Sequence, residues 1–271
     1  MNKDAILSKL PQITLGFWIM KICATTLGET AGDLLSMTLN VGYTVSSLIL
    51  FGAFLAVLLG QLLSRKHIPF LYWSVILATS TAGTTMSDFM DRTLGLGYAT
   101  GSGILLGILL VIFACWYFSG NSMSVADIRT RKLEVLYWVA ILFSNTLGTA
   151  LGDFLADDSG LGFVGGAVLI GALIAAVAAA YRFTRIPRVL LFWIAFVLTR
   201  PFGATFGDVL TKQPAMGGVG FGTIGSSAVL LAILVLGIVI TQVVAGRRLA
   251  LAPALVVDET PAIEDDSDRA L

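Results

Sequence analysis

Eight apolar stretches recur along the chain, separated by short polar segments. Each holds about 20 residues, enough for an α-helix to cross a bilayer core of about 30 Å. We expect these spans at residues 13–36, 42–63, 70–91, 97–118, 135–156, 162–181, 189–211 and 222–245. The pattern therefore predicts an all-α polytopic membrane protein with eight transmembrane helices.

The composition excludes several other classes of protein. Residues are 56% hydrophobic and only 13% charged, whereas a soluble domain carries about a quarter of its residues as Asp, Glu, Lys and Arg. The net charge is zero, which gives no electrostatic basis for binding nucleic acid. Cys23, Cys115 and His67 are too few for a disulfide framework or a zinc site. No cofactor is expected.

Basic residues gather at one set of span ends, and this asymmetry predicts the orientation. Lys and Arg near spans are retained on the cytoplasmic side, and the opposite ends carry only Arg92 and Lys212. Both termini are therefore expected in the cytoplasm, and the acidic segment 249–271 is expected to be a disordered tail. The basic residues assigned to the cytoplasm are Lys3, Lys9, Arg65, Lys66, Arg129, Arg131, Lys132, Arg182, Arg185, Arg188, Arg247 and Arg248.

An internal repeat organises the whole chain. Four segments share a Trp, a Gly ten residues later and an Asp fifteen residues after the Trp: Trp18, Gly28, Asp33; Trp73, Gly83, Asp88; Trp138, Gly148, Asp153; and Trp193, Gly203, Asp208. Each copy continues with Gly and an aromatic residue: Gly42-Tyr43, Gly97-Tyr98, Gly162-Phe163 and, displaced by three residues, Gly220-Phe221. We expect the four Trp residues to anchor helix ends at the membrane interface.

The repeats divide the chain into consecutive parts. These are an N-terminus at 1–12, repeat 1 at 13–63, repeat 2 at 64–118, a cytoplasmic linker at 119–134, repeat 3 at 135–181, repeat 4 at 182–248 and the tail at 249–271. Each repeat holds two spans, so all four copies cross the membrane in the same direction. This favours a pseudo-fourfold ring, or a pseudo-twofold pair of two-repeat halves, around a central axis.

On these residues the chain resembles a bacterial membrane family known by a repeat of unknown function, with four tandem copies that each hold two spans and a characteristic Trp. The resemblance covers nearly the whole chain through Trp18, Trp73, Trp138 and Trp193 with their downstream Gly and Asp. It implies the two-span fold unit and a bacterial inner membrane. It implies no activity, so function has to be argued from the residues.

Polar side chains form a stripe on the first helix of each repeat. Positions four, seven and eight before the repeated Asp share one face of a helix. They are Glu29, Thr26 and Thr25; Thr84, Thr81 and Ser80; Thr149, Thr146 and Asn145; and Ala204, Pro201 and Arg200. Because a carboxylate facing lipid is costly, we expect this stripe to line an internal axis. The small pairs Gly28/Gly32, Gly83/Ser87, Gly148/Gly152 and Gly203/Gly207 are expected to pack helices closely.

The charges on these spans predict attraction for cations. Five carboxylates, from Glu29 and the four repeated Asp residues, stand against Lys21 and Arg200, which leaves a net charge of −3. We expect Arg200 to pair with a membrane carboxylate. Lys21 is expected either to take part in such pairing or to extend to the interface. Pro201 is expected to kink or break its helix.

The favoured function is a transporter or exporter of a cation. Oxygen ligands suit a hard metal ion such as Mn²⁺ or Mg²⁺, and exchange of a proton at a carboxyl would supply coupling. The candidate metal ligands are Asp33, Asp88, Asp153 and Asp208. The wider ion-binding set adds Glu29, Asn145, Thr26, Thr84 and Thr149, and Arg200 and Lys21 are candidates for gating or charge pairing. Membrane lipids and the cation are the expected partners, with a homo-oligomer left open.

Other functions stay open as alternatives. One is a transporter of small organic solutes through an aromatic-lined cavity. Another is a cation channel, because the four Gly-aromatic pairs are similar to a potassium-channel filter; pairs at helix starts away from the axis would remove that argument. An enzyme is not expected, because four equivalent Asp residues differ from the two specialised carboxyls of an intramembrane aspartyl protease.

Overall fold

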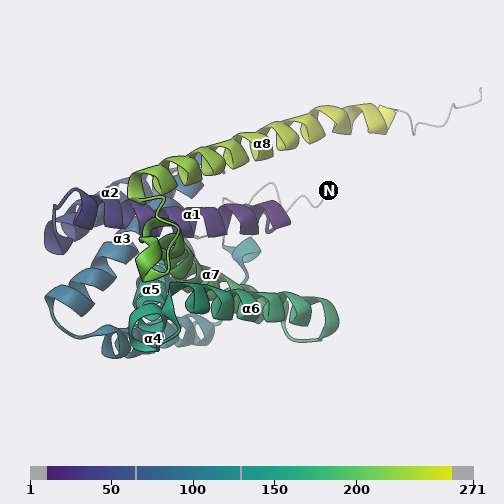
Figure 1. Cartoon of the computed structure of the whole chain (residues 1–271). Coiled ribbons are helices and arrows are strands. Elements are labelled where there is room, and N and C mark those ends of the chain that lie inside the picture. The colour runs from purple at the N-terminus through teal and green to yellow at the C-terminus, as the bar shows by residue number, and fades with distance from the viewer. Residues whose placement is uncertain (1–10, 65, 129, 258–271) are drawn as a thin grey trace, which may run out of the picture.

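The computed structural model describes residues 11–64, 66–128 and 130–257. These residues form an all-helical protein with no strand among them, which confirms the all-α part of the prediction. Figure 1 shows the arrangement. The long helices are α1 (Leu15–Asp33), α2 (Tyr43–Leu63), α3 (Pro69–Asp88), α4 (Tyr98–Phe118), α5 (Arg131–Asp153), α6 (Gly162–Phe183), α7 (Arg188–Thr211) and α8 (Thr223–Val257).

Six of these helices have the length and composition to cross a membrane. They are α2, α4, α6, α7, α8 over Thr223–Val244, and α5 with its continuation to Asp158. The helices α1 and α3 fall outside this set. Both carry many hydroxyl residues, and α1 also carries Lys21, Glu29 and Asp33. Both pack against several other helices, so a polar face in them need not meet lipid.

Four central helices form a closed cycle. Each of α1, α3, α5 and α7 contacts the next in chain order, and α7 returns to contact α1. The contacts run through glycine: Gly28 lies against Ser80, Gly83 against Asn145, Gly148 against Arg200, and Gly203 against Thr25. A Cβ atom at any of these glycines would meet the neighbouring helix at 3.0 Å or less. The expectation that these glycines are packing devices is confirmed.

The outer helices cover the central ones in a shifted order. The helix α2 packs on α3, α4 on α5, α6 on α7, and α8 on α1; Figure 1 shows α8 running alongside α1. Each outer helix therefore covers the central helix of the following repeat. Large apolar side chains such as Leu48, Val111 and Val168 stay exposed on the outer helices, which suits contact with lipid chains.

The Gly-aromatic pairs lie at the starts of outer helices. Gly42 and Gly97 precede the first residues of α2 and α4 with positive φ angles of 79° and 72°. Gly162 begins α6, and Gly220 lies shortly before α8. The pairs thus form turns that begin the outer helices, and the rings of Tyr43 and Tyr98 lie 5.8 and 5.4 Å from the guanidinium of Arg92, so the channel alternative stays open.

Three of the four repeated Trp residues are core residues, so the expectation that they anchor the interface is wrong for them. Trp73, Trp138 and Trp193 are at most 4% exposed, whereas Trp18 is half-buried. Each packs edge-on or tilted against aromatic rings of its own and neighbouring helices. The Trp ring is large enough to fill the space between central helices, and this burial outweighs its preference for the interface.

The ends of several elements differ from the expected boundaries. The helix α5 starts at Arg131, inside the expected linker, and Val125 and Ile128 of that linker are buried in the core. The helix α8 continues to Val257, into the segment expected to be a tail. The helix α7 runs unbroken across Pro201. Residues 1–10 and 258–271 lie outside the described residues, as do Arg65 and Arg129.

Candidate ion-binding axis

The four repeated Asp residues lie at the same end of the four central helices. Asp33, Asp88 and Asp153 are the last residues of α1, α3 and α5, each followed by a short π-helix. Asp208 lies one turn before the end of α7. All four are at most 5% exposed. They are therefore buried between helices rather than pointing outward into lipid.

Two basic residues link the Asp side chains in pairs. Lys212 Nζ lies 3.4 Å from an oxygen of Asp33 and 3.1 Å from one of Asp208. Arg92 Nε lies 2.9 Å from Asp88, and its Nη2 lies 3.6 Å from Asp153. One cation thus bridges α1 and α7, and the other bridges α3 and α5.

Arg92 and Lys212 were not among the predicted site residues. Both were expected among the charges at the ends of the spans opposite the cytoplasm. Both stand four residues after a repeated Asp, and this spacing puts two side chains on one helix face. The i,i+4 spacing is the signal that would have found them.

Lys212 is held in its charged form by the carboxylates beside it. Its side chain is only 25% exposed. Burial lowers the pKa of Lys212, but the carboxylates of Asp208 and Asp33 raise it by more, so the pKa lies above the ordinary lysine value. Lys212 therefore carries its positive charge throughout the physiological pH range.

Arg200 and Glu29 form a fully buried ion pair in the middle of the central cycle. Arg200 Nη1 lies 2.9 Å from Glu29 Oε2, and neither residue is more than 3% exposed. Arg200 was expected to pair with a membrane carboxylate, and Glu29 is its partner. Ion pairs at this depth are strong because water does not compete for them, although burying the charges is itself costly.

Hydroxyl groups from two further helices complete this ion pair. Arg200 Nη2 donates to the Thr149 hydroxyl at 2.6 Å and to the Thr84 hydroxyl. Both hydroxyls also lie within 3.4 Å of Glu29 Oε2. Glu29, Thr84 and Thr149 hold the same position in repeats 1 to 3, and Ala204 holds it in repeat 4. The guanidinium from α7 thus joins one side chain from each of the other central helices.

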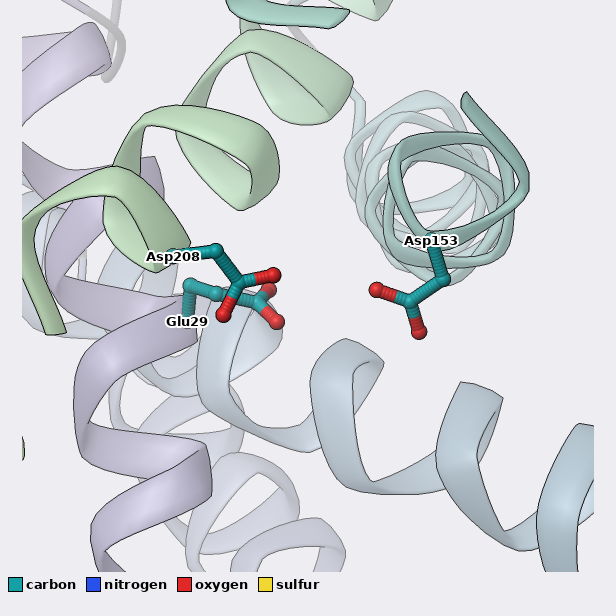
Figure 2. Close-up of side chains that lie close together, drawn as sticks. All are labelled: Glu29, Asp153 and Asp208. Atoms are coloured by element: carbon teal, nitrogen blue, oxygen red, sulfur yellow. The ribbon is translucent and has the colours of Figure 1, made fainter. Parts of the chain in front are cut away.

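A group of three carboxylates lies beside the Arg200 pair. One oxygen each from Glu29, Asp153 and Asp208 comes within 4.8 Å of the others. Figure 2 shows Glu29 and Asp208 close together, with Asp153 pointing toward them from another helix. The predicted metal set was the four Asp residues. Within the described residues, the geometry groups Asp153 and Asp208 with Glu29, while both also pair with Arg92 or Lys212; Asp33 and Asp88 have only the pairs with these basic residues.

The remaining candidates of the polar stripe divide into two kinds. Asn145 donates to the Thr79 hydroxyl at 2.9 Å and so links α5 to α3. Thr26 instead donates to the carbonyl of Ile22 in its own helix, and Thr146 does the same with Leu142. The threonine hydroxyls seven residues before the Asp therefore bond to carbonyls of their own helix. The side chains of the stripe that bond to a neighbouring central helix stand four or eight residues before the Asp.

Lys21 is buried rather than extended to the interface. It is 0% exposed, and its Nζ lies 4.0 Å from the centre of the Phe196 ring. Its amine makes no hydrogen bond to any described residue. The contact with Phe196 is a cation–π interaction, and it holds Lys21 apart from the carboxylates nearer the other end of α1.

The charge balance of the axis differs from the balance inferred from the sequence. The central helices carry five carboxylates, three basic residues that pair with them, Arg200, Arg92 and Lys212, and Lys21, which lies apart. The expected surplus of three negative charges therefore falls to one when all groups are ionised. Within the Asp layer the surplus stays larger, because each bridging cation is shared by two Asp residues.

A comparison with protein-family models finds one family that matches most of the chain. The model for a Repeat of Unknown Function (DUF347) matches residues 16–67, 71–122, 136–186 and 191–248. Neither the curated proteins nor the solved structures contain a match. The four matched segments coincide with the four Trp-Gly-Asp copies and cover most of the chain. The chain therefore belongs to the family built from four copies of the Repeat of Unknown Function DUF347.

Proposed function

We propose that the chain is a multi-pass membrane transporter of a hard metal cation such as Mn²⁺ or Mg²⁺. The observation that carries this proposal is the group formed by Glu29, Asp153 and Asp208, whose carboxylate oxygens lie within 4.8 Å of one another. They come from three different central helices. Oxygen-only ligands suit hard divalent cations.

The Asp layer supports the same function through its unsatisfied oxygens. Asp33 Oδ1 and Asp88 Oδ2 accept no hydrogen bond from the described residues. Four carboxylates share two cations in this layer, so a divalent ion or protons would balance its charge. Exchange of one for the other gives proton-coupled transport, because both compete for the same carboxylates.

We place the transporter in the bacterial inner membrane with eight spans and both termini in the cytoplasm. The cyclic contacts of α1, α3, α5 and α7 support a pseudo-fourfold arrangement around an axis along the membrane normal. The polar α1 and α3 span the membrane inside the cover that α2 and α8 provide. Cysteine labelling at exposed Ser122 and Met216 tests the topology; reagents that cannot cross the membrane should reach Met216→Cys, and not Ser122→Cys, in intact cells.

Flux into proteoliposomes tests the proposed transport. The parent protein should carry Mn²⁺, with Mg²⁺ and Ca²⁺ as competitors, and Asp153→Asn and Asp208→Asn should each reduce the flux at least about tenfold, since each removes a charged ligand. Asp157→Asn is the matched control, because Asp157 is an exposed carboxylate near the same end of α5. Equal flux in all variants would contradict the proposal.

Transport of a small organic solute is the second candidate. It is favoured by the aromatic rings near Lys21: Phe196 lies against the amine, Phe192 packs on Phe196, and Phe17 packs on Phe192. A buried amine beside aromatic rings suits a solute with a carboxylate and an apolar group better than a metal ion. Uptake of labelled amino acids and organic acids into the same liposomes separates the two candidates. Only transport of a metal cation predicts that the flux depends strictly on Asp153 and Asp208.

A further inference from the structure

The position of Arg200 bears on how a cation could enter and leave the site. Its guanidinium is 0% exposed and donates to the Glu29 carboxylate, to the hydroxyls of Thr84 and Thr149, and to the carbonyls of Thr25 and Ser80. These partners lie on α1, α3 and α5. One side chain from α7 therefore ties all four central helices together.

Glu29 belongs to two groups at once. Its carboxylate is the partner of Arg200, and it is also one of the three carboxylates that could hold a metal ion. A divalent ion held by Glu29, Asp153 and Asp208 would place two positive charges close to a guanidinium in surroundings where water screens little. Such charges repel strongly. Cation binding and the Arg200–Glu29 pair therefore oppose each other.

We infer that Arg200 is a built-in competitor of the transported cation and the lock of the central helices. This inference rests on the proposed cation transport. With no cation bound, Arg200 neutralises Glu29 and holds α1, α3 and α5 around it. A bound cation takes Glu29, displaces the guanidinium and releases the ties to the Thr84 and Thr149 hydroxyls. The return of Arg200 to Glu29 then expels the cation.

The sequence of the four repeats fits this role. The residue four before the Asp is Glu, Thr and Thr in repeats 1 to 3, and Ala in repeat 4. Ala204 is fully buried and its side chain is only a methyl group. The guanidinium of Arg200, one turn earlier on α7, therefore has room beside Ala204, at the height of Glu29, Thr84 and Thr149. Arg92 and Lys212 lie beside the other two carboxylates of the group, Asp153 and Asp208. Arg200 differs from them because it is fully buried and bonds to three other central helices at once.

Binding and flux measured on the same variants test the inference. Mn²⁺ binding to the purified protein in nanodiscs is followed by the electron paramagnetic resonance signal of free Mn²⁺. Arg200→Gln removes the competing charge, so we expect its Kd for Mn²⁺ to fall at least about tenfold, as the loss of a like charge near a divalent ion requires. The same variant should transport Mn²⁺ more slowly, because nothing expels the bound ion. Arg182→Gln, an exposed arginine on α6, is the control and should change neither quantity.

A second variant covers the case in which Arg200→Gln does not fold. Arg200→Lys keeps a positive charge, but an ammonium lacks the planar fork that reaches Glu29 and both hydroxyls at once. We expect it to bind Mn²⁺ severalfold more tightly than the parent. Every folded Arg200 variant binding with a Kd within twofold of the parent would overturn the inference while leaving the proposed function intact. Absence of Mn²⁺, Mg²⁺ and Ca²⁺ binding in parent and variants alike would overturn the proposed function itself.

Discussion

Gly148 of α5 packs directly against the side chain of Arg200 on α7, with no room between them for a methyl group. The backbone of one central helix thus forms the wall against which the buried arginine is held. The same relationship recurs at each of the other three contacts of the cycle, where the neighbour is Ser80, Asn145 or Thr25. Close approach of the backbones is therefore a condition for the polar contacts across the axis.

Substitution of Gly148 by Ala should destabilise the protein. The added methyl group would push α5 from α7 and displace Arg200, at a cost of about 1–3 kcal/mol. Gly52→Ala on α2 is the control, since nothing lies within 4 Å of a Cβ atom there, and it should be neutral or slightly stabilising. Unfolding of the two purified variants and the parent in detergent measures the difference. Equal stability of both variants would contradict the close packing.

Lys212→Met should destabilise the protein at pH 7 and still do so at pH 9. Lys212 bridges Asp33 and Asp208, and loss of this partly buried bridge should cost roughly 1–3 kcal/mol. The folded-state pKa of Lys212 is raised, so its contribution is fully present below the ordinary lysine value. It is lost only as the pH rises through the raised value. Denaturation of parent and variant at both pH values checks this, and a difference that vanishes by pH 9 would refute it.

Lys21→Met should raise the stability of the protein. The amine of Lys21 is fully buried and makes no hydrogen bond to the described residues. Replacing a buried, unpaired polar group by an apolar one of similar length removes its desolvation cost, and we expect a gain of about 1–3 kcal/mol. Ile141→Met on α5, also fully buried, is the control and should change stability little. A loss of stability in Lys21→Met would mean that the contact with Phe196 outweighs burial.

The buried tyrosine pair offers a test by double mutation. The hydroxyls of Tyr72 and Tyr137 lie 2.8 Å apart, and both residues are 0% exposed. Tyr72→Phe and Tyr137→Phe should each cost about 1–2 kcal/mol, because each leaves the other hydroxyl without its partner. The double variant should cost less than the sum of the two. Additive losses in a double-mutant cycle would show that the hydroxyls act independently.

Much of the fold could be predicted from repeated spacing. The Trp-Gly-Asp pattern identified the four helices that form the central cycle and the glycines that pack them, because helical periodicity fixes which positions share a face. The repeated spacing could not predict that α2 packs on α3, the central helix of the next repeat, rather than on α1 of its own repeat. That choice depends on the lengths and shapes of loops between helices, and apolar outer faces carry little information about which neighbour they meet.

The site was predicted in part. Glu29, Asp153 and Asp208 come together, and Arg200 finds a carboxylate. The pairing of Arg92 and Lys212 with the Asp residues was not predicted, because a count of charges by span ends does not consider which residues a single helix turn brings together. Thr26 was included on periodicity alone, although a threonine on a helix can donate to its own backbone instead.

The contact between α8 and α1 has a consequence for how the protein is made. Synthesis runs from the N-terminal to the C-terminal side, so α1 is made well before α8, the helix that covers it. Until α8 is complete, the helix with Lys21, Glu29 and Asp33 lacks the outer partner that shields it from lipid. We therefore expect α1 to reach its buried position only after α8 has been made, and truncations that remove α8 should leave a chain that the cell's quality control recognises and degrades.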